Sequence, residues 1–86
     1  MSLSNAEAKA IAGFKEFANG GVVVSVRTKD GREFSPVLIC SYKYICAVPG
    51  YDEPPFISSD IDSIWQSPED KAIRRGMYKW NFFLTL

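Results

Sequence analysis

The chain has 86 residues, 47% of them hydrophobic and 14% aromatic, which fits one small domain with a packed core and excludes a disordered chain. Ten basic residues balance ten acidic ones and histidine is absent, so no net positive charge draws the chain to nucleic acid or anionic lipid. No apolar run reaches the about 20 residues of a membrane-spanning helix and no secretory signal pattern is present, so we expect a cytoplasmic protein with reduced cysteines and no membrane partner.

Ser4 to Ala18 predicts an amphipathic helix. Ser4 and Glu7 have the spacing of a reciprocal capping box at its start. The apolar residues on one helical stripe are Leu3, Ala6, Ala10, Ile11, Phe14, Phe17 and Ala18. The glycine-rich residues 19–21 are expected to end this helix.

A β-rich region follows. Val22 to Lys29 and Arg32 to Cys40 predict two strands joined by a tight Asp30-Gly31 turn, and Pro36 indicates a bulge or an edge position in the second. Ser41 to Tyr44 is either a second tight turn or part of a long bent strand, and we favour the turn because a longer strand would be unusual in so small a domain.

The next segments predict shorter elements. Tyr44 to Val48 is expected to be the third strand, and Pro49 to Pro55 an irregular loop. Phe56-Ile57 is expected to start a fourth strand, and Ile61 to Trp65 is a strand or a 3-10 turn.

The C-terminal part predicts a helix and a strand. Ser67 as a cap, Pro68 and two acids indicate a helix over residues 68–75, which Gly76 ends. Met77 to Leu86 predicts a last strand. The fold class is therefore α+β and mainly β, in one domain over residues 1–86: a helix at 4–18, a small strongly bent antiparallel sheet or barrel at 22–65, and a helix-strand extension at 67–86.

Two stretches carry a family resemblance. In Gly21 to Phe34 a valine-rich strand runs into an Asp-Gly-Arg turn, and Ile57 to Ile64 has an Asp-Ile-x-x-Ile pattern. Over residues 4–65 the chain resembles the Sm-like family, or SH3-like barrels generally, which implies a small β-barrel. The Asp…Asn signature with which Sm proteins contact RNA bases is replaced here by Ser41 to Tyr44, so the resemblance does not imply RNA binding through those residues.

Cys40 and Cys46 would face each other across the second hairpin if its turn were centred on Lys43. Two thiols can ligate a metal or form a redox-sensitive bridge, but zinc needs about four ligands, and the chain has no histidine and no further cysteine. We therefore expect both cysteines to be small core residues, and their pairing stays open.

The carboxylates of the loop-rich region are those of Asp52, Glu53, Asp60 and Asp62. A carboxylate pair can bind a divalent cation. We favour the alternative, in which Asp60 caps a turn after Ser58-Ser59 and Asp62 points to water. We expect no metal and no cofactor.

Basic and aromatic residues flank the two predicted hairpin turns. They are Arg27, Lys29 and Arg32 at the first turn and Tyr42, Lys43 and Tyr44 at the second. If the turns lie close together, these side chains form an edge that can stack bases and hold phosphates. Asp30 and Glu33 cancel much of the charge, so binding of RNA or single-stranded DNA is a disfavoured alternative.

The predicted last strand carries bulky apolar side chains on both faces, among them Tyr78, Trp80, Phe82 and Phe83. Either the short helix or a second subunit could cover the outer face. Together with the neutral charge, this pattern leads us to expect a homo-oligomer with its interface at these four residues.

No glycine-rich phosphate loop, nucleophile elbow or metal-ligand spacing occurs in the sequence, so we expect no enzyme. The sequence favours a small non-enzymatic binding or assembly module that is homo-oligomeric. Two alternatives remain: an Sm-like protein that binds RNA or single-stranded nucleic acid, and an accessory or inhibitor protein that docks to a larger partner.

Overall fold

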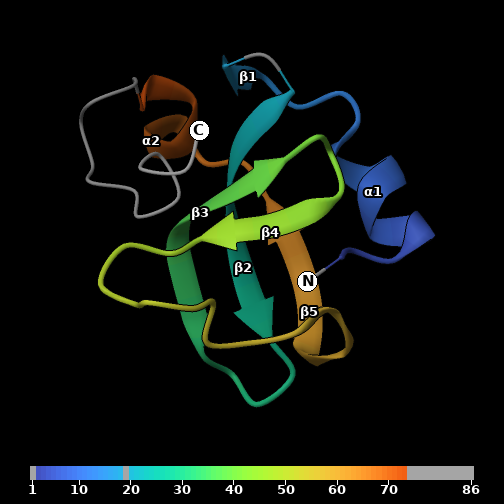
Figure 1. The fold of residues 1–86 in the computed structure, drawn as a ribbon, viewed down its shortest axis with the longest axis vertical. Coiled ribbons are helices and arrows are strands. Elements are labelled where there is room, and N and C mark those ends of the chain that lie inside the picture. Colours follow the sequence, from blue (N-terminus) through green and yellow to red (C-terminus); the bar gives the residue numbers. More distant parts are fainter. Residues whose placement is uncertain (1, 19, 74–86) are drawn as a thin grey trace.

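The computed structural model describes residues 2–18 and 20–73, and an antiparallel sheet is its main feature (Figure 1). In chain order the elements are α1 (Asn5–Ile11), β1 (Glu16–Ala18), β2 (Gly21–Thr28), β3 (Glu33–Cys40), β4 (Tyr44–Ala47), the 3-10 turn η1 (Ser58–Asp60), β5 (Ile61–Trp65) and α2 (Pro68–Ala72). The α+β class with strand as the main component is confirmed.

Strand β2 is the centre of the sheet. One of its edges pairs with β3 along most of its length, and the other edge pairs first with β1 and then with β5, as in Glu16↔Val22 and Val26↔Ile64. The strand order is β1-β2-β3-β4 with β5 beside β2. Among residues 2–18 and 20–73 no pairing joins β4 to β5 or β1, so the sheet is not closed into a barrel there.

Both faces of the sheet are covered, which is why six consecutive residues of β2 are buried. The larger cluster contains Val22, Val24 and Val26 of β2 and receives Ile11 from α1. The other face holds Val23, Leu38, Ala47 and Ile73, the last of which directly follows α2. Each helix thus serves a different face of the sheet.

The predicted helix over Ser4–Ala18 is wrong in its second half. The capping box forms as expected, with Ser4 N–H donating to Glu7 over 2.8 Å and Glu7 N–H donating to Ser4 over 3.2 Å. The helix ends at Ile11, and residues 16–18 pair with β2 instead. Because a few backbone pairs with a neighbouring strand outweigh the small differences in helix propensity, the 3.6-residue pattern of this segment is overridden.

The glycine signals near this region have a different role from the one expected. Gly20 has φ +73° and stands in the turn between β1 and β2, so it turns a hairpin and does not end a helix. Gly31, with φ +89°, turns the β2–β3 hairpin as predicted, and Thr28 N–H donates to the Arg32 carbonyl over 2.8 Å.

Pro36 lies at a bulge, as predicted. Val24 pairs with Val37 and Val26 pairs with Phe34, so the two residues 35 and 36 of β3 stand opposite Ser25 alone. The bulge leaves proline, which has no N–H, outside the regular ladder.

The remaining segments agree in part with the prediction. The strand expected at Phe56-Ile57 is wrong: Phe56 is buried in a bend against Phe34, with ring centroids 5.1 Å apart, and η1 follows. Residues 61–65 form the strand β5, and α2 is confirmed as a helix that begins at Pro68. The predicted end of that helix at 74–75 and the strand over 77–86 lie outside the described residues.

Candidate binding groove

A groove runs beside the end of β5, where three segments of chain converge. It has a volume of about 570 Å³ and is lined by Gly13, Phe14, Lys15, Ile64, Trp65, Gln66 and Lys71. The turn after α1 provides the first three residues, β5 and the residue after it provide the next three, and α2 provides the last. Phe14 and Ile64 pack against the core, so the apolar wall of the groove is continuous with the interior.

Gln66 holds the two walls of the groove together. Its side-chain oxygen accepts a hydrogen bond from Lys15 N–H over 2.9 Å, and its side-chain nitrogen donates to the Lys15 carbonyl over 2.9 Å. The same nitrogen donates to the Val23 carbonyl over 3.1 Å. One side chain thereby ties the turn after α1 to β2, and the groove is formed before any ligand arrives.

The lining of the groove is positive and aromatic. Among the residues that the structure describes, it contains two lysines and no carboxylate. Outside the lining, the Arg27 guanidinium carbon lies 5.7 Å from the centroid of the Trp65 ring, within the range of a cation–π contact. The groove therefore suits a ligand that combines an apolar side chain with a carboxylate.

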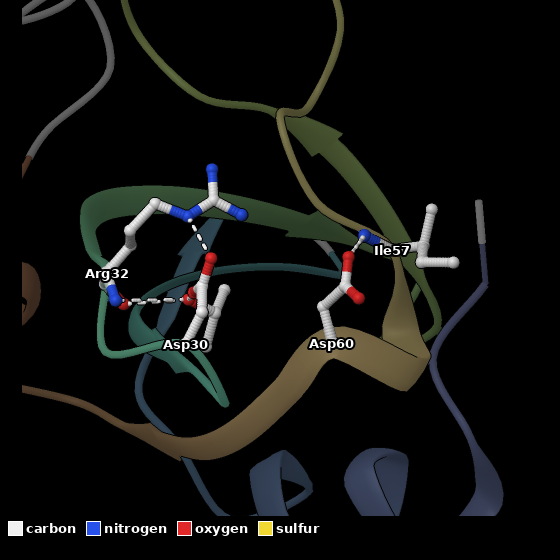
Figure 2. Close-up of polar contacts among 5 residues, drawn as sticks. Asp30, Arg32, Ile57 and Asp60 are labelled. Atoms are coloured by element: carbon white, nitrogen blue, oxygen red, sulfur yellow. Dashed lines mark hydrogen bonds and ion pairs between the residues drawn. The ribbon is translucent and has the colours of Figure 1, made fainter.

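The tip of the β2–β3 hairpin holds a second polar cluster, shown in Figure 2. Asp30 accepts hydrogen bonds from the Thr28 hydroxyl and, over 2.8 Å, from Arg32 Nε. Asp60 accepts a hydrogen bond from Ile57 N–H over 3.1 Å and so caps η1, as predicted, while Asp62 is exposed. The Thr28 hydroxyl, followed by Arg32, holds the pKa of the Asp30 carboxyl below its usual value.

Replacing Thr28 with valine is expected to raise the pKa of Asp30 towards its ordinary value, because the strongest donor to the carboxylate is lost. A lowered pKa in the folded state stabilises the fold above the ordinary pKa of the group, and this contribution is lost as the pH falls through the folded value. A carboxyl-carbon NMR titration measures the shift. Arg27→Gln is the matched control. Arg27 forms its ion pair with Glu33, at 2.5 Å, so its replacement should leave the pKa of Asp30 unchanged.

The six residues expected to bind nucleic acid do not form one surface. Arg27, Lys29 and Arg32 surround the turn before β3, whereas Tyr42, Lys43 and Tyr44 surround the turn after it, so the two groups lie at opposite ends of this strand (Figure 1). Both arginines are paired with carboxylates within the hairpin, and the Lys43 ammonium lies 5.6 Å from the Tyr44 ring centroid. The Tyr42 hydroxyl donates to Glu16, whose carboxylate raises the pKa of this tyrosine.

A buried carboxylate that the sequence analysis assigned only to a helix end links α2 to the sheet. Asp70 accepts hydrogen bonds from the Ser25 hydroxyl over 2.7 Å and from the Ser35 hydroxyl over 3.2 Å. Its carboxylate also accepts from Ser67 N–H over 3.0 Å, which completes a capping box. Ser25 and Asp70 are each 3% exposed, whereas Ser35 is exposed, so the buried pair of Ser25 and Asp70 is a structural element that joins α2 to β2.

The remaining predicted site residues are the loop carboxylates and the expected interface. Asp52 and Glu53 are exposed on the loop after β4. No group of three or more side chains with metal-ligand chemistry occurs in the described part of the chain. The expected interface residues Tyr78, Trp80, Phe82 and Phe83 lie outside it.

The groove itself was missed by the sequence analysis. Its lining comes from three segments that meet only in the folded chain, and no local pattern marks Phe14, Lys15 or Gln66 as neighbours of Trp65. Comparison with known protein families, with curated proteins and with solved structures found no match. No helix within residues 2–18 and 20–73 is long and apolar enough to cross a membrane.

Proposed function

We propose that this chain is a small non-enzymatic binding module that assembles with copies of itself, the groove of one copy receiving the acidic loop of the next. The groove beside Trp65 is the observation that carries this proposal, because it is preformed, partly apolar and positively charged. The Sm-like or SH3-like relationship remains part of the proposal. It is supported by the order of helix, Asp-Gly hairpin and a last described strand that returns to β2.

The chain itself offers an occupant of matching chemistry. The loop after β4 presents Tyr51, whose side chain is 48% exposed, next to the exposed carboxylates of Asp52 and Glu53. The Tyr51 ring meets the Phe34 ring edge-on, with centroids 6.0 Å apart, which anchors the loop to the core. An aromatic ring followed by two carboxylates complements a groove with aromatic walls and lysines.

The loop and the groove lie towards different ends of the molecule. Figure 1 shows the loop between β4 and η1 in the lower half of the view and α2 at the top, whereas the groove lies where β5 leads into α2. Contact between two different surfaces is heterologous, so one copy can bind a second, which can bind a third. Such assembly gives rings or open chains and needs no partner other than the protein itself.

Self-association is expected to rise with concentration from the micromolar range upwards and to weaken with salt. Lys15→Glu and Asp52→Lys should each lower the association constant at least about tenfold, since each places like charges against one another. Sedimentation velocity over a concentration series measures this. Lys9→Glu, on the exposed surface of α1, is the matched control and should associate as the unaltered chain does.

Mixing the two reversed variants sharpens the test. The Lys15→Glu groove and the Asp52→Lys loop have opposite charges, so an equimolar mixture should associate although neither variant does so alone. A chain that is monomeric at every concentration contradicts the proposal. If neither Lys15→Glu nor Asp52→Lys weakens association, the chain assembles through another surface, such as the one expected at residues 78–83. That result contradicts the role of the groove.

A further inference from the structure

Two thiols lie together on the β3–β4 hairpin. The turn covers residues 41–43, so Cys40 pairs with Tyr44 and not with Cys46, contrary to the expected symmetric arrangement. The register then shifts between Leu38 and Ile39, which makes Cys46 the extra residue of a bulge in β4. Both cysteines are free and half-buried, so they are not the sealed core residues that the sequence suggested.

The two thiols are in hydrogen-bond contact, and they are not equivalent. Hydrogen bonds from the Cys40 thiol and, secondarily, from the Cys40 backbone lower the pKa of the Cys46 thiol to about 7, although burial opposes this. The same contact, together with burial, raises the pKa of the Cys40 thiol well above its usual range. The contact therefore favours the thiolate form at Cys46 and the protonated form at Cys40.

A pair of thiols with one lowered and one raised pKa suits thiol–disulfide exchange. The thiolate is the attacking species, and a thiol whose pKa lies near the ambient pH combines a large thiolate fraction with good nucleophilicity. A second thiol in contact with the first can then displace the group that the first has captured. Half-burial leaves Cys46 open to a small molecule, while Cys40 packs against the apolar cluster that contains Val23, Leu38 and Ala47.

We propose that Cys46 and Cys40 form a thiol–disulfide exchange site for low-molecular-weight disulfides, with Cys46 as the attacking thiol and Cys40 as the resolving thiol. This site is separate from the groove and does not depend on the function proposed for it.

The exchange has two balanced steps. The Cys46 thiolate attacks one sulfur of a small disulfide such as oxidised glutathione, the S–S bond breaks, and one glutathione thiolate leaves. Cys40 then loses its proton to solvent and attacks the Cys46 sulfur, which expels the second glutathione thiolate and forms the Cys40–Cys46 disulfide. Two protein thiols are oxidised, and one small disulfide is reduced to two thiols. Capture of Cys46 in the first step removes the contact that kept Cys40 protonated, so the second step follows readily.

The test uses the full chain, reduced and then exposed to oxidised glutathione at neutral pH, with acid quenching and intact-mass measurement. The unaltered chain should lose two hydrogens and retain no glutathione. Cys40→Ser should accumulate a mixed disulfide on Cys46, because the resolving thiol is gone. Cys46→Ser should react at least about tenfold more slowly, since Cys40, without the Cys46 thiol, returns only to the pKa of an ordinary cysteine and is mostly protonated at neutral pH.

The unaltered chain alone decides the main point, so the result does not depend on the folding of the variants. If it keeps glutathione on both cysteines, or if it does not react, the exchange site is rejected. Faster reaction of Cys46→Ser than of Cys40→Ser would reverse the two roles and overturn the assignment. The surface variant Lys9→Glu should exchange as the unaltered chain does.

Discussion

Replacing Asp70 with alanine is expected to destabilise the fold by about 3 kcal/mol, as the loss of a buried, hydrogen-bonded carboxylate typically does. The Ser25 hydroxyl, 3% exposed, would lose its charged acceptor and keep only the Ser35 hydroxyl, 2.8 Å away, as a partner. The Ser67 N–H would lose the capping oxygen at the start of α2. Because α2 has five residues and cannot persist without tertiary contacts, its attachment to the sheet should loosen as a whole.

Urea unfolding followed by circular dichroism measures this change as a lower midpoint. Glu69→Ala is the matched control, since Glu69 is an exposed acid in the same first turn and should cost less than about 1 kcal/mol. Asp70→Asn keeps the shape and one acceptor oxygen and should fall between the two. Equal effects of Asp70→Ala and Glu69→Ala would show that the buried cluster does not hold α2 to the sheet.

Ile39→Ala is expected to cost about 2–5 kcal/mol, the range for removing a buried isoleucine from a tight core. Ile39 is 0% exposed in β3 and pairs with Val22 on one side and Ile45 on the other. A domain of this size has a total stability of about 5–15 kcal/mol, so the loss should remove a large part of it.

Ile57→Ala provides the same chemical change at the surface. Ile57 is 51% exposed, so its replacement should alter the free energy of unfolding by no more than about 0.5 kcal/mol. Thermal unfolding of both variants beside the unaltered chain measures the difference. Similar melting temperatures for the two variants would contradict the position of β3 in the centre of the core.

Local signals predicted the elements whose formation is decided by neighbours in the sequence. The capping residues Ser4 and Ser67 mark the starts of both helices, and Asp30-Gly31 marks the turn between β2 and β3. Pro36 marks the bulge because its missing N–H acts wherever the strand lies. Each of these features depends on interactions within a few residues, which a sequence displays directly.

The errors arose where distant contacts decide the outcome. The stripe that includes Phe14 has helical spacing, and Phe14 does pack against the core, but the following residues pair with β2. Apolar residues at helical spacing can also be buried when they lie in a turn. Periodicity alone therefore did not distinguish a longer helix from a short helix followed by a turn. The segment at Phe56 was likewise apolar enough for a strand but lacks a partner strand among the described residues.

The expected basic and aromatic edge could have been corrected without a structure. Successive turns of antiparallel hairpins alternate between the two ends of the strands that they join. Arg32 and Lys43 are separated by the whole length of β3 and therefore lie far apart. The groove beside Trp65 is different, because it depends on Gln66 reaching a turn fifty-one positions away, and no rule of local sequence foretells that contact.

The double pairing of one edge of β2 has a consequence for how the protein is made. As the chain leaves the ribosome, β2 and β3 can pair early as a hairpin. Half of the other edge of β2 then remains unpaired until residues 61–65 emerge. A bare strand edge pairs readily with a neighbouring nascent chain. Distant pairing also forms slowly, because loop-closure entropy is lost before contacts compensate it. The speed of translation across residues 48–65 therefore sets how long the unpaired edge of β2 in each nascent chain can pair with another chain.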